Sequence, residues 1–148
     1  MSYSIDVNIL LYSSDASSPF HKRALEFMEA CAKNSEPVFL AYLTLLSYIR
    51  IATHPRIFTN PLTPKEALEN IGKLSDLPQV RLVSEREGFL ELYEETTKEV
   101  TVRANLVPDA HLATLLRQHG VSTLYTNNVG DSTKFGFLDV RNPLPSLE

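Results

Sequence analysis

The sequence predicts an α/β fold in which a central parallel sheet of about four to five strands is flanked by helices on both faces. Short apolar segments alternate with longer segments of helical periodicity, as in chains built from βαβ units. No internal repeat or low-complexity linker interrupts this alternation. Because 148 residues suit one domain with a substantial core, we expect a single domain over residues 1–148.

The first quarter of the chain contains a predicted strand, a polar break and an amphipathic helix. Residues 3–5 form the short apolar strand, and Ser- and Pro-containing residues 13–19 form the break. Residues 21–33 then show helical periodicity. The side chains expected to face the core are those of Ala24, Leu25, Phe27, Met28 and Cys31.

The middle of the chain continues the alternation. Residues 38–41 predict a buried strand, and residues 43–53 predict a helix that ends before the His54-Pro55 pair. Residues 57–62 form a loop whose apolar side chains a monomer does not fully bury. Thr63, Pro64 and Glu66 have the spacing of a helix start with a capping box, so we expect a helix to about residue 74.

The rest of the chain predicts two or three more strands and two more helices. Residues 80–83 form a strand, and Ser84 and Glu87 are spaced as a second capping box for a helix reaching about residue 98. Residues 108–119 predict a helix that Gly120 ends. Residues 123–126 form a strand, and residues 138–140 a short last one.

Composition and charge exclude some classes of function. The net charge of −4 argues against a broad basic surface for nucleic acid, although a bound cation can offset local negative charge in a nuclease. No apolar run approaches the roughly 20 residues that span a bilayer, so we expect no membrane association. The N-terminus lacks the pattern of a secretory signal, and the single Cys31 excludes an internal disulfide, so we expect a cytoplasmic protein.

Two carboxylates from distant segments are candidates for a shared site. Asp6 follows the first predicted strand, at the edge where open α/β sheets hold ligands. Asp109 begins a helix on the same face as Leu112, Ala113 and Leu116, whereas His111, Thr114 and Gln118 lie on the opposite face. Each acid alone also fits a structural role, because Asp6 can cap the next helix and Asp109 can stabilise a helix dipole. An inward carboxylate needs a partner, and a divalent cation is one.

The sequence resembles the PIN-domain ribonucleases, and within them the VapC-type toxins of type II toxin–antitoxin pairs. The resemblance covers nearly the full length in order and spacing. It is carried by residues 6–12 (DVNILLY), 106–113 (LVPDAHLA), 124–126 (LYT) and 135–143, and residues 50–56 (RIATHPR) are similar to one branch of the family. No single segment is decisive, but four in register are fairly specific.

The resemblance implies a PIN-like three-layer sandwich with an acidic pocket at the strand ends. Such pockets bind Mg²⁺ or Mn²⁺ and hydrolyse phosphodiester bonds in RNA, and Mg²⁺ is commonly held by one or two carboxylates with substrate phosphates. It assigns Asp6 and Asp109 to metal binding, and Asp6, Asp109 and Asp131 to catalysis. It also implies a cognate antitoxin as partner and a homodimer.

The chain departs from the family at two of its usual acids. Ser47 stands where the family's second acid lies, with Thr44 one turn earlier on the same face; the branch with the 50–56 pattern lacks this glutamate. Asn128 stands at the first acid after the strand that ends at Thr126, and Asp131 matches the second acid only with a one-residue insertion. Asp131 equally fits a turn-capping role. We therefore expect one weak metal site that fills fully when a substrate phosphate arrives.

Other polar residues near these segments have supporting roles. Asn8, Thr44, Ser47, Thr126 and Asn128 are candidate polar groups around the carboxylates. The candidate RNA contacts are Arg50, His54, Arg56 and Arg103, each of which also fits an ordinary solvated position.

Three alternatives remain open at this stage. The missing acids make a PIN module with weakened or lost catalysis, which binds RNA or an antitoxin, an alternative to the ribonuclease. A phosphotransfer enzyme of the haloacid-dehalogenase type needs a second aspartate where Asn8 stands. A dinucleotide-binding domain needs a glycine-rich loop after the first strand, which this sequence lacks.

Overall fold

Five parallel strands form one sheet in the order β3-β2-β1-β4-β5 in the computed structural model, which describes residues 1–144. The strands are β1 (Tyr3–Ile5), β2 (Val38–Ala41), β3 (Val80–Val83), β4 (Thr123–Tyr125) and β5 (Asp139–Arg141). The helices are α1 (Val7–Ser14), α2 (His21–Lys33), α3 (Tyr42–Ala52), α4 (Pro64–Ser75), α5 (Phe89–Thr97), a 3-10 turn η1 (Ala104–Leu106), α6 (Val107–Gln118) and α7 (Val129–Ser132).

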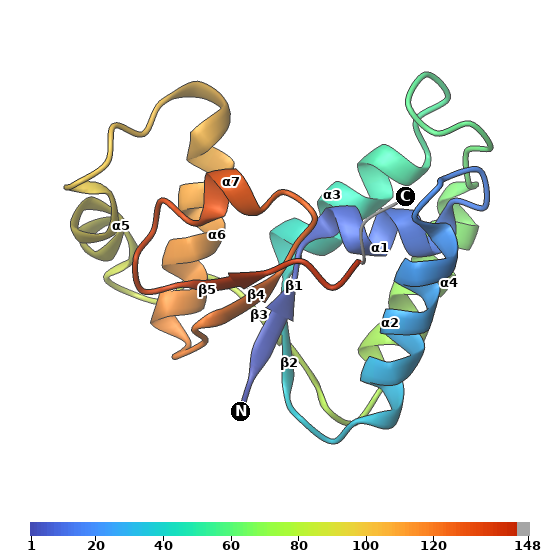
Figure 1. Cartoon of the computed structure of the whole chain (residues 1–148), viewed down its shortest axis with the longest axis horizontal. Helices are drawn as coiled ribbons and strands as arrows, with labels where there is room; N and C mark the ends of the chain where they lie inside the picture. Colours follow the sequence, from blue (N-terminus) through green and yellow to red (C-terminus); the bar gives the residue numbers. More distant parts are fainter. Residues whose placement is uncertain (145–148) are drawn as a thin grey trace.

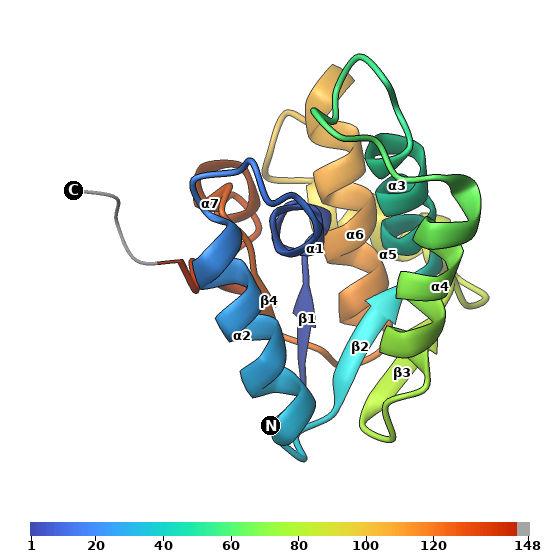
Figure 2. The same cartoon turned by 90° about the vertical axis from the view of Figure 1, so that its right-hand side faces the viewer.

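Helices cover both faces of the sheet, so the predicted three-layer α/β architecture is confirmed (Figure 1). The side chains of Tyr3 and Ile5 pack in a core cluster with α1, α2, α3 and α4. Leu124 packs in a second cluster with α5 and α6 on the opposite face. Figure 2 shows β1 in the middle of these layers, with α2 and α6 on different sides of it. A central strand buried on both faces is typical of parallel sheets.

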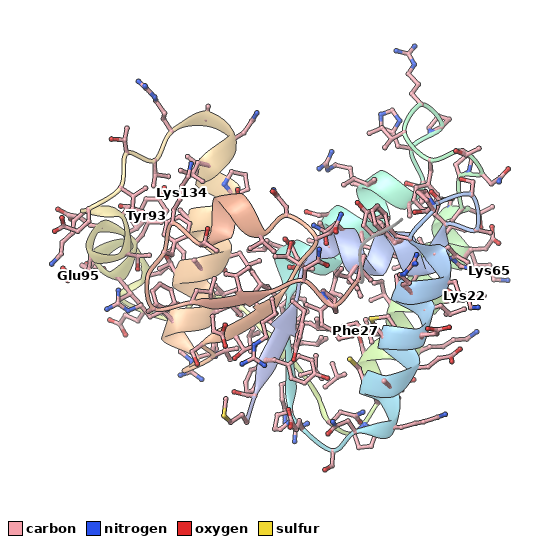
Figure 3. The ribbon with its side chains drawn as sticks, viewed as in Figure 1. Lys22, Phe27, Lys65, Tyr93, Glu95 and Lys134 are labelled. Carbon is pink, nitrogen blue, oxygen red and sulfur yellow. The ribbon has the colours of Figure 1, made fainter. Side chains whose placement is uncertain are left out.

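Aromatic side chains join the helices to the sheet. Phe27 of α2 lies on the side of the helix that faces the sheet (Figure 3), and its ring centroid is 5.0 Å from that of Tyr125 in β4. Tyr125 also meets Tyr3 of β1 edge to face at 5.2 Å. These contacts pack α2 against β1 and β4. Within the described residues, no helix is long and apolar enough to cross a membrane.

Local sequence signals decide several element ends. Thr63 accepts a hydrogen bond from the Glu66 amide while the Glu66 side chain accepts one from the Thr63 amide, which is the predicted capping box at the start of α4. Gly120 has a φ of +70° directly after α6, a left-handed conformation that a glycine adopts without strain. Both helix ends were predicted from sequence alone.

The second predicted capping box is wrong. Helix α5 begins at Phe89, its N-cap is Gly88 with a φ of +84°, and no side chain caps it. The preceding loop is instead attached to α6, because Gln118 accepts a hydrogen bond from the Arg86 amide and donates one to the Arg86 carbonyl. The ring Nε2 of His119 also contacts the Ser84 carbonyl oxygen at 2.8 Å. Contacts with a distant helix therefore override the local capping pattern.

Two predicted helix faces also differ from the structure. Thr114 was expected on the outer face of α6, but it is fully buried and its hydroxyl donates to the Ala110 carbonyl. Since α5 packs over α6, α6 is enclosed on more than one side. Leu25 was expected to face the core, but it is 40% exposed and lines a groove beside α2.

Candidate active site

The sheet order places the candidate site at the carboxyl ends of β1 and β4. The chain adds β2 and β3 on one side of β1, and β4 and β5 on the other. A crevice forms where the connections leave in opposite directions, and this is where open α/β sheets bind ligands. Asp6 follows β1 and Thr126 follows β4. The backbone amide of Asp6 donates to the Tyr125 carbonyl (2.9 Å), which fixes the two strand ends together.

Both oxygens of the Asp6 carboxylate accept hydrogen bonds. Oδ1 accepts from the Val7 amide (2.8 Å), so Asp6 is the N-cap of α1, and Oδ2 accepts from the Thr126 hydroxyl (2.9 Å). Asp6 therefore caps a helix and also faces the site, which combines two roles that the sequence left as alternatives. Burial raises the pKa of Asp6 above its ordinary value, and the hydrogen bonds from Thr126 and Val7 offset part of that rise.

The Thr126 hydroxyl is fully used by its neighbours. It is completely buried and donates to Asp6 Oδ2. It accepts from the Asn8 side-chain amide (3.0 Å) and from the Asn128 backbone amide (3.0 Å). A hydroxyl has one hydrogen and two lone pairs, so these three bonds use its whole capacity. The orientation of the hydroxyl toward Asp6 is therefore fixed.

Asp6 and Asp109 line the same cavity. This cavity has a volume of about 280 Å³ and lies between α1, α3, α6 and the segment after β4. Asp109 is half-buried in the first turn of α6. The remaining lining residues are Val7, Asn8, Leu43, Thr44, Ser47, Arg50, Ile51, Pro108, Leu112 and Asn128. The two acids, which lie about a hundred positions apart in the sequence, therefore share one site.

Helix α3 brings hydroxyls and one cation to the cavity. Thr44 and Ser47 line it from successive turns, and Arg50 lies one turn beyond Ser47 on the same side. The position where the family resemblance expects a second acid is therefore inside the site, but it carries the neutral Ser47. With Asn128 also neutral, the charged side chains among the described residues of the cavity wall are Asp6, Asp109 and Arg50.

Not every predicted site residue reaches the cavity. His54, Arg56 and Arg103 do not line it; His54 Nδ1 accepts a hydrogen bond from the Arg56 amide in the turn after α3. Arg103 is exposed before η1. Asp131 lies in α7, but its side chain falls outside the described part of the structure, so its assignment stays a prediction. Among the side chains that the structure describes, no group of three or more His, Cys, Asp or Glu could hold a metal ion.

Sequence reasoning missed two asparagines behind the cavity. The backbone amide of Asn127 donates to Asn8 Oδ1 (3.1 Å). The Asn127 side chain donates to the Tyr12 hydroxyl (3.3 Å) and accepts from Asn142 Nδ2 (3.1 Å). Asn127 belongs to a polar run that follows a strand, which is a signal the sequence contains. Asn142 carries no such signal, because only the fold brings it to Asn127.

The chain is similar to curated ribonucleases over nearly its full length. No family model matches the chain. Ribonuclease VapC48 of Mycobacterium tuberculosis (strain H37Rv) is 38% identical over 143 residues, which is 97% of this chain and 98% of the relative.

Solved structures share the fold at lower identity. VapBC2 from Rickettsia felis, bound to a DNA fragment from its promoter, aligns with a TM-score of 0.67 and 16% identity over 96% of this chain and 98% of that chain. A toxin–antitoxin complex from Klebsiella pneumoniae aligns with a TM-score of 0.60 and 17% identity over 95% and 97%. The likeness to VapC48 over almost the full length of both proteins shows that this chain belongs to the VapC ribonuclease family.

Proposed function

We propose that this chain is the toxin of a type II toxin–antitoxin pair, a cytoplasmic single-domain endoribonuclease that hydrolyses RNA phosphodiester bonds with one divalent cation. The observation that carries the proposal is the cavity in which Asp6, Asp109 and Arg50 converge at the carboxyl ends of β1 and β4. Family membership supports the reaction class, since the 38% identical relative is named a ribonuclease.

The residues of the cavity fit a hard divalent cation. Asp6 and Asp109 would hold Mg²⁺ or Mn²⁺, and the amide oxygen of Asn128 is a ligand type that such cations accept. Burial raises the pKa of Asp6 because it removes water from the charged carboxylate. A bound cation would stabilise that charge in place of the lost water. When bound, the cation would neutralise phosphate charge and polarise the phosphoryl oxygen. One or two carboxylates with substrate phosphates suffice for Mg²⁺, so the thinned acidic set suits one weak site.

The remaining side chains of the wall have roles toward RNA. Arg50 would bind a phosphate oxygen at the cavity, because a guanidinium presents several donors to a phosphate. Thr44 and Ser47 hydroxyls would hydrogen-bond water or a phosphate oxygen from the α3 side. His54, Arg56 and Arg103 remain candidate contacts for more distant parts of the RNA.

The test of catalysis compares three proteins in Mg²⁺ and in Mn²⁺. We expect wild type to cleave RNA, and Asp6→Asn and Asp109→Asn to lose at least about 100-fold in rate, since removing metal ligands and charge stabilisation of this kind costs several kcal/mol. Equal and negligible cleavage by all three proteins would contradict catalysis. That result would favour the second candidate, a PIN module that binds RNA or an antitoxin without cleaving, which the neutral Ser47 and Asn128 in the cavity wall make a specific alternative.

A groove on the helical face fits a protein partner. It lies between α1, α2, α3 and α4, has a volume of about 530 Å³, and has a mostly apolar lining. Leu25 and Met28 of α2 and Ile71, Leu74 and Leu77 at the α4 side line it. We propose that the antitoxin covers this groove, since the Klebsiella structure of the same fold is a toxin–antitoxin complex.

The partner surface is tested by co-purification with the product of the neighbouring reading frame. We expect Leu25→Glu or Leu74→Glu to abolish co-purification, because each places a charge on the apolar lining. Leu68→Glu is the matched control, since Leu68 is 59% exposed on α4 and does not line the groove. Equal loss with the control would argue against the groove.

We further propose a homodimer that buries exposed apolar side chains of α3. Tyr42 is 50% exposed and Leu46 is 64% exposed. Leu46→Glu should shift the sedimentation coefficient from dimer to monomer, and an unchanged coefficient would contradict this surface.

A further inference from the structure

A chain of hydrogen bonds joins the segment after β5 to the Asp6 carboxylate. It begins at Asn142, whose Oδ1 accepts from the Leu144 amide (3.0 Å) and whose Nδ2 donates to Asn127 Oδ1 (3.1 Å). It continues through Asn127 itself, whose side-chain Oδ1 accepts from Asn142 and whose backbone amide donates to Asn8 Oδ1 (3.1 Å).

The chain ends at the candidate metal ligand. Asn8 Nδ2 donates to the Thr126 hydroxyl (3.0 Å), which donates to Asp6 Oδ2 (2.9 Å). In each of these hydrogen bonds, the donor lies on the Asn142 side and the acceptor on the Asp6 side.

Two features make this chain rigid. Asn8 uses one end of its amide as acceptor and the other as donor, so only one orientation of that amide satisfies both partners. Leu144 is buried, with 5% of its surface exposed, in the core cluster that contains β1 and α1. The far end of the chain is thus held by apolar packing, whereas the near end is held by the saturated Thr126 hydroxyl.

We propose that Asn8, Asn127 and Asn142 are positioning residues that hold the Thr126 hydroxyl as a fixed donor to Asp6 and thereby set the orientation of the Asp6 carboxylate for its cation. None of the three needs to contact the reacting atoms. Partners that orient a metal ligand typically affect metal affinity or activity by about 10–100-fold. This inference rests on the proposed metal-dependent function, and it adds that the segment after β5 supports the site.

The decisive variant is Asn142→Asp. Its carboxylate can still accept from the Leu144 amide, so the local turn is kept, but it cannot donate to Asn127 Oδ1. Asn142 is exposed and does not line the cavity, so the change leaves the wall intact. Asn34→Asp is the matched control, because Asn34 is an exposed asparagine whose Oδ1 accepts from the amide two residues later (Glu36, 2.8 Å). Asn34 is not among the described residues that line the cavity.

Two measurements separate positioning from a structural role. The first measurement is Mn²⁺ binding in the absence of RNA, which is detected as the shift in Tm with increasing Mn²⁺ concentration. The second is RNA cleavage, with kcat and KM determined separately. We expect Asn142→Asp to raise the half-saturating Mn²⁺ concentration about 3- to 10-fold and to lower kcat by a similar factor, with KM within twofold of wild type. Asn8→Ala should show a larger loss of about 10–100-fold in both measurements.

Each outcome either supports or overturns the proposal. Asn34→Asp should match wild type in both measurements. If Asn142→Asp also matches wild type, or if Asn34→Asp loses as much as Asn142→Asp, Asn142 does not position the site. Should Asn8→Ala fail to fold, the Asn142 pair still gives the answer. If wild type cleaves no RNA, the proposed function fails, but the Mn²⁺ titration still decides whether the chain of asparagines supports Asp6.

Discussion

Replacing the buried Thr126 hydroxyl tests whether the hydrogen bonds around Asp6 stabilise the fold. Thr126→Val keeps nearly the same shape and removes the hydroxyl, so Asp6, the Asn8 side chain and the Asn128 amide each lose a partner. A neutral hydrogen bond contributes about 1 kcal/mol net, and one to a charged group about 1.5–3 kcal/mol. Asn128 is exposed and Asn8 half-buried, so water replaces part of what they lose.

We therefore expect Thr126→Val to lower the free energy of unfolding by about 3 kcal/mol, within a range of about 2–4 kcal/mol. For a domain of this size that corresponds to a fall in Tm of about 6–12 °C. Thr126→Ser keeps the hydroxyl and loses one buried methyl group, which costs about 1 kcal/mol.

Urea unfolding of the three proteins, followed by circular dichroism at constant pH without divalent cations, measures these differences. The result that refutes the reasoning is a Thr126→Val protein at least as stable as Thr126→Ser. That result would mean that the hydrogen bonds of the Thr126 hydroxyl stabilise the fold no more than the buried methyl group of Thr126 does. A loss clearly larger for Thr126→Val than for Thr126→Ser would support a stabilising role of the hydrogen bonds to Asp6, Asn8 and Asn128.

Three further predictions concern charge and backbone. Because burial raises the folded pKa of Asp6 above its ordinary value of 3.8, the native state holds a proton that the unfolded state has released between those two values. We therefore compare the free energy of unfolding of wild type with that of Asp6→Asn in the absence of metal. The difference, wild type minus variant, should fall as pH rises through that window and stay constant above it. A difference that rises with pH, measured by urea unfolding at several pH values, would contradict this sign. Arg50→Gln removes a positive charge from the cavity wall. We expect this variant to bind Mn²⁺ about two- to fivefold more tightly and to have a higher KM for RNA. An unchanged Mn²⁺ affinity, measured by calorimetry, would show that Arg50 does not affect the electrostatics of the site. Gly120→Ala should lower the free energy of unfolding by about 1 kcal/mol because φ is +70° there, although no atom lies within 4 Å of the added methyl; an unchanged unfolding midpoint would show that the strain is relieved.

The secondary structure was largely predictable because its signals are local. The start of α4 needs only Thr63, Pro64 and Glu66, and the end of α6 needs only Gly120. The start of α5 was not predictable, since the segment before it is bound by Gln118 and His119 of another part of the chain. Likewise the burial of Thr114 depends on the packing of α5 over α6.

The sequence by itself determined the parallel α/β fold and nominated Asp6 and Asp109, because alternating periodicity and a carboxylate after a strand are properties of neighbouring residues. It also located Thr44 and Ser47 on one face of a helix, and both side chains line the cavity. Only the tertiary structure decided that both acids share one cavity.

The structure alone also decided which groups hold Asp6. Asn142 reaches Asn127, and Thr126 reaches Asp6 across 120 positions. Such contacts depend on strand order, and hydrogen bonds act only over about 3 Å, so no spacing along the chain reveals them.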